Sequence, residues 1–479
     1  MNKTQINGFI RPAKIFSNIY FVGTRVASTH IIDTGAGLIL IDPGMNETLD
    51  LVIDNIREVG LCEKDIKIIL ISHGHYDHAG ATARLKKTCN AKVYLGRGDL
   101  KMVTGEEDTS LSELFNVKFT DFFTPDVLID DGDRITLGNT EILCLSTPGH
   151  TDGTMSFFFN TRLDSKTYTA GMHGGVGTNT LTREFLLKHR LPLTNREKFI
   201  CGIEKAKKQK VDVFLGNHVG NNDTEGKIKK VLSGDSLAFL NPCEWEIFLD
   251  SRIERMKTII KEEEKMNNTI QTILKEKVIV IVRGVKKDDL VRLAESCYKA
   301  GIKLLECTYD ATGTIPDEQT AENIKILAEK FDGKMLIGAG TVLSERQVEL
   351  TKKAGGKFII SPDTNVGVIK KTKQENLVSI PGALTPTEVA TAHRAGADFV
   401  KLFPVGTLGA KYLKDVCAPL SHVRFLAVGG VNADNIKTYL ENGAVGVGIG
   451  SDIVNKALIE KGDFEEITKR AKKYVDAVK

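Results

Sequence analysis

The stretch IKIILISHGHYDH, residues 66–78, places an apolar run directly before a cluster of potential metal ligands. Three histidines and one aspartate fall within residues 73–78. Successive side chains of a regular strand point to opposite faces, so these four could not converge if the strand continued. A loop at the strand end can aim all of them at one point. Neutral imidazoles and carboxylates are ligands that Zn²⁺ accepts, so the stretch predicts a metal site.

Two more histidines follow apolar runs in the same way. His150 ends STPGH after the run EILCLS, and His218 ends FLGNH after VDVFLG. A single loop histidine is usually satisfied by ordinary hydrogen bonds. Here a cluster is joined by two histidines at other strand ends, and this set favours a metal centre.

These histidines lie in a first region, to about Ser233, where strand-like and helical runs alternate. A helix is expected over about 244–265, and its charged second half should run into a polar linker. The chain is therefore predicted to divide into residues 1–262, a linker over 263–269, and residues 270–479.

After Asn268, short apolar runs recur at regular intervals, and each is followed by a helix-like segment. The eight runs are KVIVIVRG, KLLECTYD, KMLIGAGTVL, KFIISP, LVSIPGAL, DFVKLFP, RFLAVGG and AVGVGIGS. Eight strand–helix units is the count of an α/β (β/α)₈ TIM barrel. An open doubly wound sheet would give the same local pattern, but we expect the closed barrel.

Three charged residues stand in or directly after these apolar runs: Arg283, Glu306 and Lys401. Barrel active sites lie at the C-terminal ends of the strands. A lysine among apolar residues loses its proton more easily and can form a Schiff base with a ketone. The alternative is an edge-strand lysine whose ammonium reaches water. Glu306 favours the Schiff base, because that chemistry needs a proton shuttle.

The first region resembles the metallo-β-lactamase superfamily over about residues 10–235. The resemblance rests on His-x-His-x-Asp-His, LILIDPG at 38–44, TPGHTDG at 147–153 and a late strand-end histidine. It implies an αββα sandwich of the α+β class, with two zinc ions at one edge of the sheets. One zinc would be held by His73, His75 and His150, and the other by Asp77, His78 and His218.

One stretch departs from the superfamily pattern. Many of its hydrolases carry a bridging aspartate after a later strand, but residues 168–175 read YTAGMHGG, without a carboxylate. One lactamase subclass also lacks a metal ligand there. The second metal would then be held more weakly, and His173 either lines the site, contacts substrate or has no functional role.

The superfamily resemblance implies zinc-dependent hydrolysis. Zinc lowers the pKa of its bound water to about 7 and polarises a carbonyl, and Asp77 would orient the nucleophile. Lactones, thioesters, β-lactams, phosphoesters and sulfur compounds are all substrates on this fold, so the fold does not fix one. A sugar lactone or a thioester suits a metabolic fusion best.

The second region resembles the class I 2-keto-3-deoxy-6-phosphogluconate aldolases over about residues 270–478. The motifs that carry this are ECT (306–308), GAGTVL (338–343), ISP (360–362), IPGALTPTE (380–388), VKLFP (400–404), VGGV (428–431) and GVGIGS (446–451). The resemblance implies that Lys401 forms a Schiff base with pyruvate or the keto acid, with Glu306 as general acid/base and no cofactor. Thr341 would line the pyruvate pocket. Substrate phosphate would bind the loop backbone at Gly429, Gly430, Gly450 and Ser451.

Two departures leave the barrel substrate open. Asp310 stands where some members carry arginine, so Arg283 is expected to supply the cation for a carboxylate or phosphate. Ala427-Val428 replaces the usual Pro-Thr, which removes one hydroxyl donor. The phosphogluconate-derived keto acid, its galactonate epimer and 4-hydroxy-2-oxoglutarate all stay open.

Composition sets the broad class. The 479 residues carry a formal net charge of +3 without a long block of one sign, so nucleic acid and anionic membranes are not expected as partners. No apolar run is long enough for a membrane span or a secretory signal. Eight scattered cysteines without a C-x-x-C pair suit reduced thiols. We expect a cytoplasmic enzyme that acts on small molecules.

Three hypotheses follow for the whole chain. The first is a bifunctional metabolic enzyme acting on sugar-acid derivatives. The second is an aldolase, of the 4-hydroxy-2-oxoglutarate or phosphogalactonate type, whose N-terminal domain binds metal without catalysis. The third is a fusion that mainly organises an oligomer, because aldolases of this family are commonly trimers and a homotrimer through the barrel is expected. The complete ligand set favours the first.

Overall fold

The computed structural model describes residues 8–479, which form two compact units, one ending at Ile260 and the other beginning at Lys261. The expectation of no secretory signal falls partly on residues 1–7, which lie outside the described residues. None of the described helices is long and apolar enough to cross a membrane.

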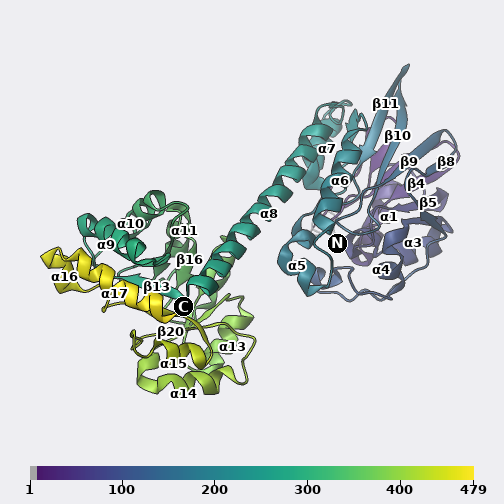
Figure 1. The fold of residues 1–479 in the computed structure, drawn as a ribbon. Coiled ribbons are helices and arrows are strands. Elements are labelled where there is room, and N and C mark those ends of the chain that lie inside the picture. Colours follow the sequence, from purple (N-terminus) through teal and green to yellow (C-terminus); the bar gives the residue numbers. More distant parts are fainter. Residues whose placement is uncertain (1–7) are drawn as a thin grey trace. The chain divides into compact units, whose positions relative to one another are not determined.

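The first unit is built on two sheets (Figure 1). The larger sheet has its seven strands in chain order, antiparallel from β1 to β4 and parallel from β4 to β7. They are β1 (Ala13–Phe16), β2 (Ile19–Phe21), β3 (His30–Asp33), β4 (Leu38–Ile41), β5 (Ile66–Ile71), β6 (Lys92–Gly96) and β7 (Val127–Ile129). The smaller sheet has the order β12-β11-β10-β9-β8. Its strands are β8 (Arg134–Leu137), β9 (Thr140–Ser146), β10 (Met155–Leu163), β11 (Lys166–Met172) and β12 (Val213–Phe214).

The first unit has four layers, two sheets between two layers of helices, because alternate side chains of a strand pack on opposite faces of its sheet. In β4, Ile39 packs between the two sheets, whereas Leu40 packs under α1 and α3. On the outer face of the smaller sheet, Trp245 of α8 packs edge-on against Phe158, with 5.7 Å between ring centroids. Figure 1 shows helices on both outer sides of the sheets, so the αββα sandwich is confirmed. The helices are α1 (Leu49–Glu58), α2 (Tyr76–Ala79), α3 (Thr82–Cys89), α4 (Leu100–Thr104), α5 (Arg183–Lys188), α6 (Asn195–Lys207), α7 (Thr224–Leu232) and α8 (Glu244–Glu276).

Helix α8 runs without interruption through residues 263–269, where a polar linker was expected. These residues are turns of the helix because the whole span lacks glycine and proline and is rich in the helix formers Glu and Lys. Its two ends belong to different cores. Trp245 and Met256 pack in the first unit, and Ile270 and Ile273 pack in the second.

The second unit is the closed barrel that the sequence predicts. Its parallel sheet has the order β17-β16-β15-β14-β13-β21-β20-β19-β18. Pro381 alone separates β17 from β18, and β17 pairs with β16 while β18 pairs with β19. These two segments are therefore one barrel strand, which joins the two edges of the sheet. An open doubly wound sheet has no such joint.

The barrel strands and helices follow the predicted order. The strands are β13 (Val278–Val282), β14 (Leu304–Thr308), β15 (Leu336–Gly340), β16 (Phe358–Ile360), β17 (Val378–Ile380), β18 (Gly382–Ala383), β19 (Val400–Leu402), β20 (Phe425–Val428) and β21 (Ala444–Ile449). The helices are α9 (Lys287–Ala300), α10 (Asp317–Lys330), α11 (Glu345–Lys353), α12 (Val366–Gln374), α13 (Pro386–Arg394), α14 (Val405–Cys417), α15 (Ile436–Glu441), α16 (Lys456–Lys461) and α17 (Phe464–Ala477). Figure 1 shows them around the strands.

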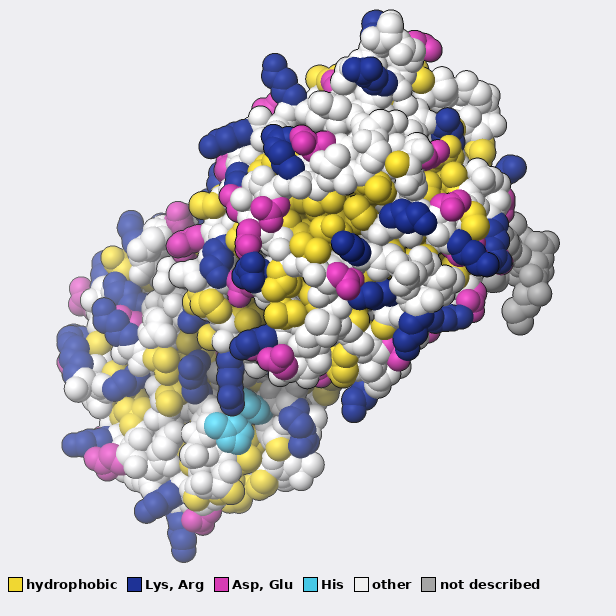
Figure 2. All heavy atoms as spheres, turned by 90° about the vertical axis from the view of Figure 1, so that its right-hand side faces the viewer, with side chains coloured by type: hydrophobic (Ala, Val, Ile, Leu, Met, Phe, Trp, Pro, Cys, Tyr) yellow, Lys and Arg dark blue, Asp and Glu magenta, His cyan; other side chains and the backbone are white. Residues whose placement is uncertain are grey.

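Figure 2 shows basic and acidic side chains scattered over one face, the basic ones more frequent, with apolar patches between them.

Candidate functional sites

His73, His75 and His150 converge at the edge of the first unit. One ring nitrogen of each lies within 4.8 Å of the others. The first two come from the loop after β5, and His150 comes from the loop after β9. Parallel strand ends and an adjacent sheet edge thus bring together residues that are 75 positions apart in sequence. The grouping predicted for one metal is present.

The second predicted group lies directly beside the first. His78 Nε2 is 3.1 Å from His218 Nε2, and Asp77 Oδ2 is 3.5 Å and 3.6 Å from these two nitrogens. The ligand atoms of Asp77 and His78 also lie within 4.8 Å of one on His73. All six predicted ligands therefore form one continuous cluster.

The other ring nitrogen of three of these histidines faces an acceptor. His150 Nδ1 donates to the carbonyl of Gly177 at 2.9 Å, and His218 Nδ1 donates to that of Val26 at 2.6 Å. His78 Nδ1 donates to Asp42 Oδ2 at 2.8 Å. Since these partners only accept, each Nδ1 carries a proton, and in its neutral form each ring presents a lone pair on Nε2.

This tautomer assignment tests whether the cluster fits a metal ion. When both rings are neutral, His78 and His218 direct two lone pairs at each other across 3.1 Å, an arrangement that needs a metal ion or a proton between them. Burial lowers the pKa of His78, but the nearby Asp77 and Asp42 carboxylates outweigh it and raise that pKa, so metal binding there displaces a proton. Burial and the neighbouring histidines lower the pKa of His73 and His75 well below the usual value. Burial lowers the pKa of His150 to about 4. Neutral imidazoles are the form that binds a metal, so the residues fit.

Two buried aspartates hold the ligand loops in place. Asp42, at φ 56° after β4, accepts from Ser72 N at 2.7 Å and Ser72 Oγ at 2.6 Å as well as from His78. Asp99 accepts from Gly74 N at 2.7 Å, Gly153 N at 2.8 Å and Thr151 Oγ1 at 2.7 Å. It ties the loop after β5 to the loop after β9. Burial raises the pKa of Asp99 to about 6.

The stretch without a carboxylate packs tightly against His150. A Cβ built on Gly175 would lie 2.5 Å from Cδ2 of the His150 ring, so a side chain there would displace that ligand. His173 is buried, its Nδ1 accepts from Gly175 N at 3.2 Å, and its Nε2 has no partner among the described residues. Burial lowers the pKa of His173 to about 3. It does not belong to either convergent group.

In the second unit, Lys401 of β19 and Glu306 of β14 both point into the barrel. They line one small void of about 10 Å³ with apolar neighbours such as Ile360 and Leu426. Lys401 is 8% exposed and Glu306 2%. Burial raises the pKa of Glu306 to about 7 and lowers the pKa of Lys401. The edge-strand alternative for Lys401 is excluded, because β19 pairs on both sides.

The glutamate fits closely against the next strand. A Cβ at Gly340 would lie 2.4 Å from Glu306 Oε1, so glycine leaves room for the carboxylate. Among the described residues, Glu306 Oε2 has no hydrogen-bond partner, and neither does Oγ1 of Thr308, two residues along the same face. Two orphaned polar atoms inside a barrel are groups that a bound substrate or water would satisfy.

Arg283 and Thr341 come together at the barrel mouth. Arg283 Nη2 donates to Thr341 Oγ1 at 3.0 Å, and Thr341 holds a left-handed backbone at φ 55°. Such a conformation is rare for a β-branched residue and is frequent at functional sites.

The predicted phosphate loops occupy two different surroundings. Gly450 and Ser451 line a pocket of about 620 Å³ with Arg283 and Lys456. Gly429 and Gly430 instead pack on the start of α14, where Gly406 N donates to the Gly429 carbonyl at 2.7 Å. Asp310, in place of an arginine, accepts from the Thr312 hydroxyl and the Ile315 amide of its own loop.

Comparison with known proteins identifies both units. The family model described as "KDPG and KHG aldolase" matches residues 270–470, and that of the "Metallo-beta-lactamase superfamily" matches residues 22–162. The 2-dehydro-3-deoxy-6-phosphogalactonate aldolase of Escherichia coli is 30% identical over 202 residues, 42% of this chain and 96% of the relative. The chain joins a metallo-β-lactamase domain to a KDPG/KHG-family aldolase domain. The 2-dehydro-3-deoxy-phosphogluconate aldolase of Haemophilus influenzae is also 30% identical, over 45% of this chain and 100% of the relative.

The lactamase domain also has a solved relative at the fold level. The native FEZ-1 metallo-beta-lactamase from Legionella gormanii is 28% identical, with a TM-score of 0.50, over 54% of this chain and 98% of that chain. The six-ligand cluster and the buried aspartates described above therefore belong to a lactamase-type fold, and Lys401 and Glu306 belong to an aldolase domain.

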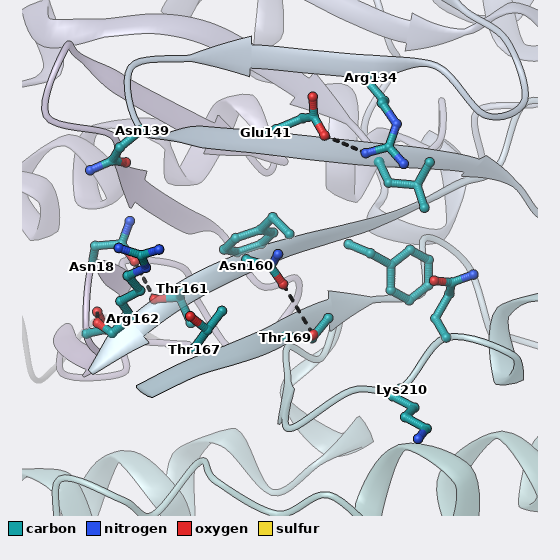
Figure 3. A pocket seen from close by; sticks show the side chains of 15 residues that line it. Asn18, Arg134, Asn139, Glu141, Asn160, Thr161, Arg162, Thr167, Thr169 and Lys210 are labelled. Carbon is teal, nitrogen blue, oxygen red and sulfur yellow. Dashed lines mark hydrogen bonds and ion pairs between the residues drawn. The ribbon is translucent and has the colours of Figure 1, made fainter. Parts of the chain in front are cut away.

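The lactamase domain also has a pocket of about 850 Å³, which none of the predicted site residues lines (Figure 3). It lies over the outward-facing side chains of β8–β11. Several of its polar groups are already paired, as Arg134 with Glu141 and Thr169 with Asn160. We assign it no catalytic role, because it contains no residue of the ligand cluster.

Proposed function

We propose that the aldolase domain is a class I enzyme that cleaves 2-dehydro-3-deoxy-6-phosphogluconate or a related keto acid to pyruvate and an aldehyde. The observation that carries this is Lys401, an amine buried in the barrel among apolar side chains beside Glu306. Burial lowers the pKa of Lys401, so a larger share of the amine is neutral and nucleophilic.

Glu306 is placed for the proton transfers. Its pKa of about 7 lets it hold a proton or release it at neutral pH. After Lys401 Nζ adds to the keto carbon, Glu306 can protonate the leaving hydroxyl, and water is lost to form the imine. It can then take the proton of the hydroxyl at C4 as the C3–C4 bond breaks. The hydrogen bond from Arg283 orients Thr341 beside the carboxylate end of the substrate.

Borohydride trapping tests the proposal. Full-length protein incubated with pyruvate and borohydride should gain the mass of a reduced adduct on Lys401. Lys401→Ala should gain none, whereas Lys411→Ala, an exposed lysine of α14, should be trapped like the wild type. Trapping of Lys401→Ala at the wild-type level would refute the assignment.

We propose further that the lactamase domain is a zinc-dependent hydrolase of a lactone or thioester. What supports this is the convergence of five imidazoles and the Asp77 carboxylate, with His150 and His218 each holding a proton on the nitrogen that faces away from the cluster. His73, His75 and His150 would hold one ion, and Asp77, His78 and His218 the other. The ions would supply an activated water and polarise the carbonyl. The chain's own contribution is to fix the tautomers and to orient that water through Asp77.

Metal content and hydrolysis test this second proposal. The wild type should hold two zinc ions per chain, and His150→Ala and His218→Ala should each hold fewer. His393→Ala, a histidine of the barrel, serves as the matched control. If zinc-loaded protein hydrolysed neither lactones nor thioesters, the domain would bind metal without catalysis, as in the second hypothesis.

Two further proposals concern the whole protein. We propose that it assembles as a homotrimer through the barrel and acts on small molecules in the cytoplasm. A mass measurement in solution tests the assembly, and a monomer would contradict it.

A further inference from the structure

The pocket of about 850 Å³ in Figure 3 lies on the outer face of the smaller sheet, and no residue of the ligand cluster lines it. Strands β8–β11 form its floor, and Gln209 and Lys210, which follow α6, line one side. Phe158, which Trp245 of α8 contacts edge-on, also lines it. The pocket therefore begins where the helix layer stops covering this face of the sheet.

The polar side chains of the floor follow the strand register. Three sets of cross-strand neighbours share the outer face: Arg134–Leu143–Phe158, Asn160–Thr169 and Arg162–Thr167. Arg162 lies four residues along β10 from Phe158, which is about 13 Å at about 3.3 Å per residue. The two arginines are therefore separated along the strands, and a ligand that contacts both must be extended.

The charged residues of the pocket are mostly basic. Three cations, Arg134, Arg162 and Lys210, face a single carboxylate, that of Glu141. Glu141 is paired with Arg134, whereas Arg162 and Lys210 form no ion pair with any described residue. Figure 3 shows these two unpaired cations apart from each other in the lining. A concave surface with two separated, uncompensated cations attracts a ligand that carries more than one negative charge.

Two amides of the lining present their donors to the pocket. The side-chain oxygen of Asn160 accepts from Thr169 Oγ1 at 3.3 Å, and that of Asn139 accepts from Thr140 Oγ1 at 3.0 Å. The NH₂ group of each amide has no hydrogen-bond partner among the described residues. Since an amide NH₂ only donates, the free polar groups of the floor are donors that suit an oxygen-rich ligand.

The apolar part of the pocket lies almost entirely below its surface. Phe158 is 4% exposed and Phe159 3%, so neither ring offers a face on which a nucleic-acid base could stack. Leu143 is half-buried, and no other apolar side chain lines the pocket to anchor a peptide. The accessible lining consists of hydroxyls, amides and charges, which complement the hydroxyls and carboxylates of an acidic sugar.

We propose that this pocket binds an acidic oligosaccharide, a short chain of hexuronate units. Its carboxylates pair with Arg162 and Lys210, which lie too far apart for one small acid to contact both. Its hydroxyls accept from the amides of Asn139 and Asn160. The pocket makes and breaks no bond, so this binding is independent of the reactions proposed for the two domains.

Calorimetry on the full-length protein tests the ligand class. Tetragalacturonate should bind, and its affinity should fall as salt is added. Monomeric galacturonate, which reaches one cation, should bind at least tenfold more weakly, and the neutral maltotetraose should not bind measurably. Absence of tetragalacturonate binding would overturn the proposal. Equal binding by tetrauridylate, or by a tetraglutamate peptide with blocked ends, would overturn the choice of an oligosaccharide.

Variants place the ligand in this pocket rather than at the metal ligands. Arg162→Ala and Lys210→Ala should each weaken tetragalacturonate binding about tenfold. Lys87→Ala, an exposed lysine of α3 on the opposite helix layer, is the matched control and should bind like the wild type. Zinc content and aldol cleavage should be unchanged in all three, which shows that each variant is folded. Wild-type affinity in both pocket variants would overturn the site.

Discussion

Replacing Asp42 by asparagine should disable one metal ligand without touching the metal. The Asp42 carboxylate is fully buried and accepts from Ser72 N at 2.7 Å, Ser72 Oγ at 2.6 Å and His78 Nδ1 at 2.8 Å. The substitution keeps the size of the side chain and turns one oxygen into an amide donor. With Oδ1 still accepting from Ser72 N, the new NH₂ faces His78 Nδ1.

The tautomer of His78 then has to change. A donor opposite Nδ1 requires a lone pair there, so the proton moves to Nε2, which is the nitrogen that faces His218 at 3.1 Å. A protonated Nε2 cannot bind a metal. Losing a partner that orients a metal-bound histidine costs about 10–100-fold in metal affinity, or roughly 1.4–2.8 kcal/mol.

Competition with a chelator measures this loss. Asp42→Asn should bind its second zinc about 10–100-fold more weakly, while the ion held by His73, His75 and His150 is affected less. Asp65→Asn, at an exposed aspartate just before β5, should match the wild type. If Asp42→Asn held both zinc ions with wild-type affinity, the tautomer argument would be wrong.

Three further substitutions probe the barrel. Burial raises the pKa of Glu306 from 4.5 to about 7, so between these pH values the folded state holds a proton that the unfolded state has lost. The free energy of unfolding of the wild type should therefore fall by about 3 kcal/mol as the pH rises from 4.5 to 7. Glu306→Gln should flatten this pH profile, measured by urea unfolding, and an unchanged slope would refute the argument. Gly340→Ala should lower the free energy of unfolding by about 1–3 kcal/mol and lower kcat for aldol cleavage, because the new Cβ would lie 2.4 Å from the Glu306 carboxylate. A variant with wild-type kcat would show that the carboxylate can move away. Ile273→Ala, fully buried under the barrel strands, should lower the free energy of unfolding by about 2–5 kcal/mol, whereas the exposed Lys275→Ala should change it little.

The metal ligands could be predicted because their residue types and their places after apolar runs are visible in the sequence. The residues that hold them could not. Asp42 appears only as part of DPG after a strand, and its role depends on β4 and β5 lying side by side. Asp99 stands in a stretch without any motif, and it matters because it reaches backbone amides from two loops 79 residues apart, at Gly74 and Gly153.

Strands without a sustained apolar run are not predicted from the sequence. The sequence predicts β4 and β5 because both of their faces are buried and apolar. β8 reads RITL and has one face exposed to solvent, and β11 reads KTYTAGM and is exposed only at its first two residues; both lack a sustained apolar run. In helix α8, a charged stretch suggested a polar linker over residues 263–269, but the structure continues the helix through it. Glu and Lys favour helix, and the buried Ile270 and Ile273 anchor its end.

The two candidate sites differ in the charged side chains that line them. At the barrel mouth, Arg283 and Lys456 line a wide pocket with a glycine-rich loop, which suits a phosphorylated sugar acid. Beside the metal ligands, the lining carries acids and an apolar wall, and none of the described lysines or arginines lines it. A phosphate would meet cationic side chains at the first site, whereas at the second the only cations would be the proposed zinc ions. The fusion therefore does not require that one domain pass its product to the other, and kinetic tests for such transfer should start from two unrelated substrates.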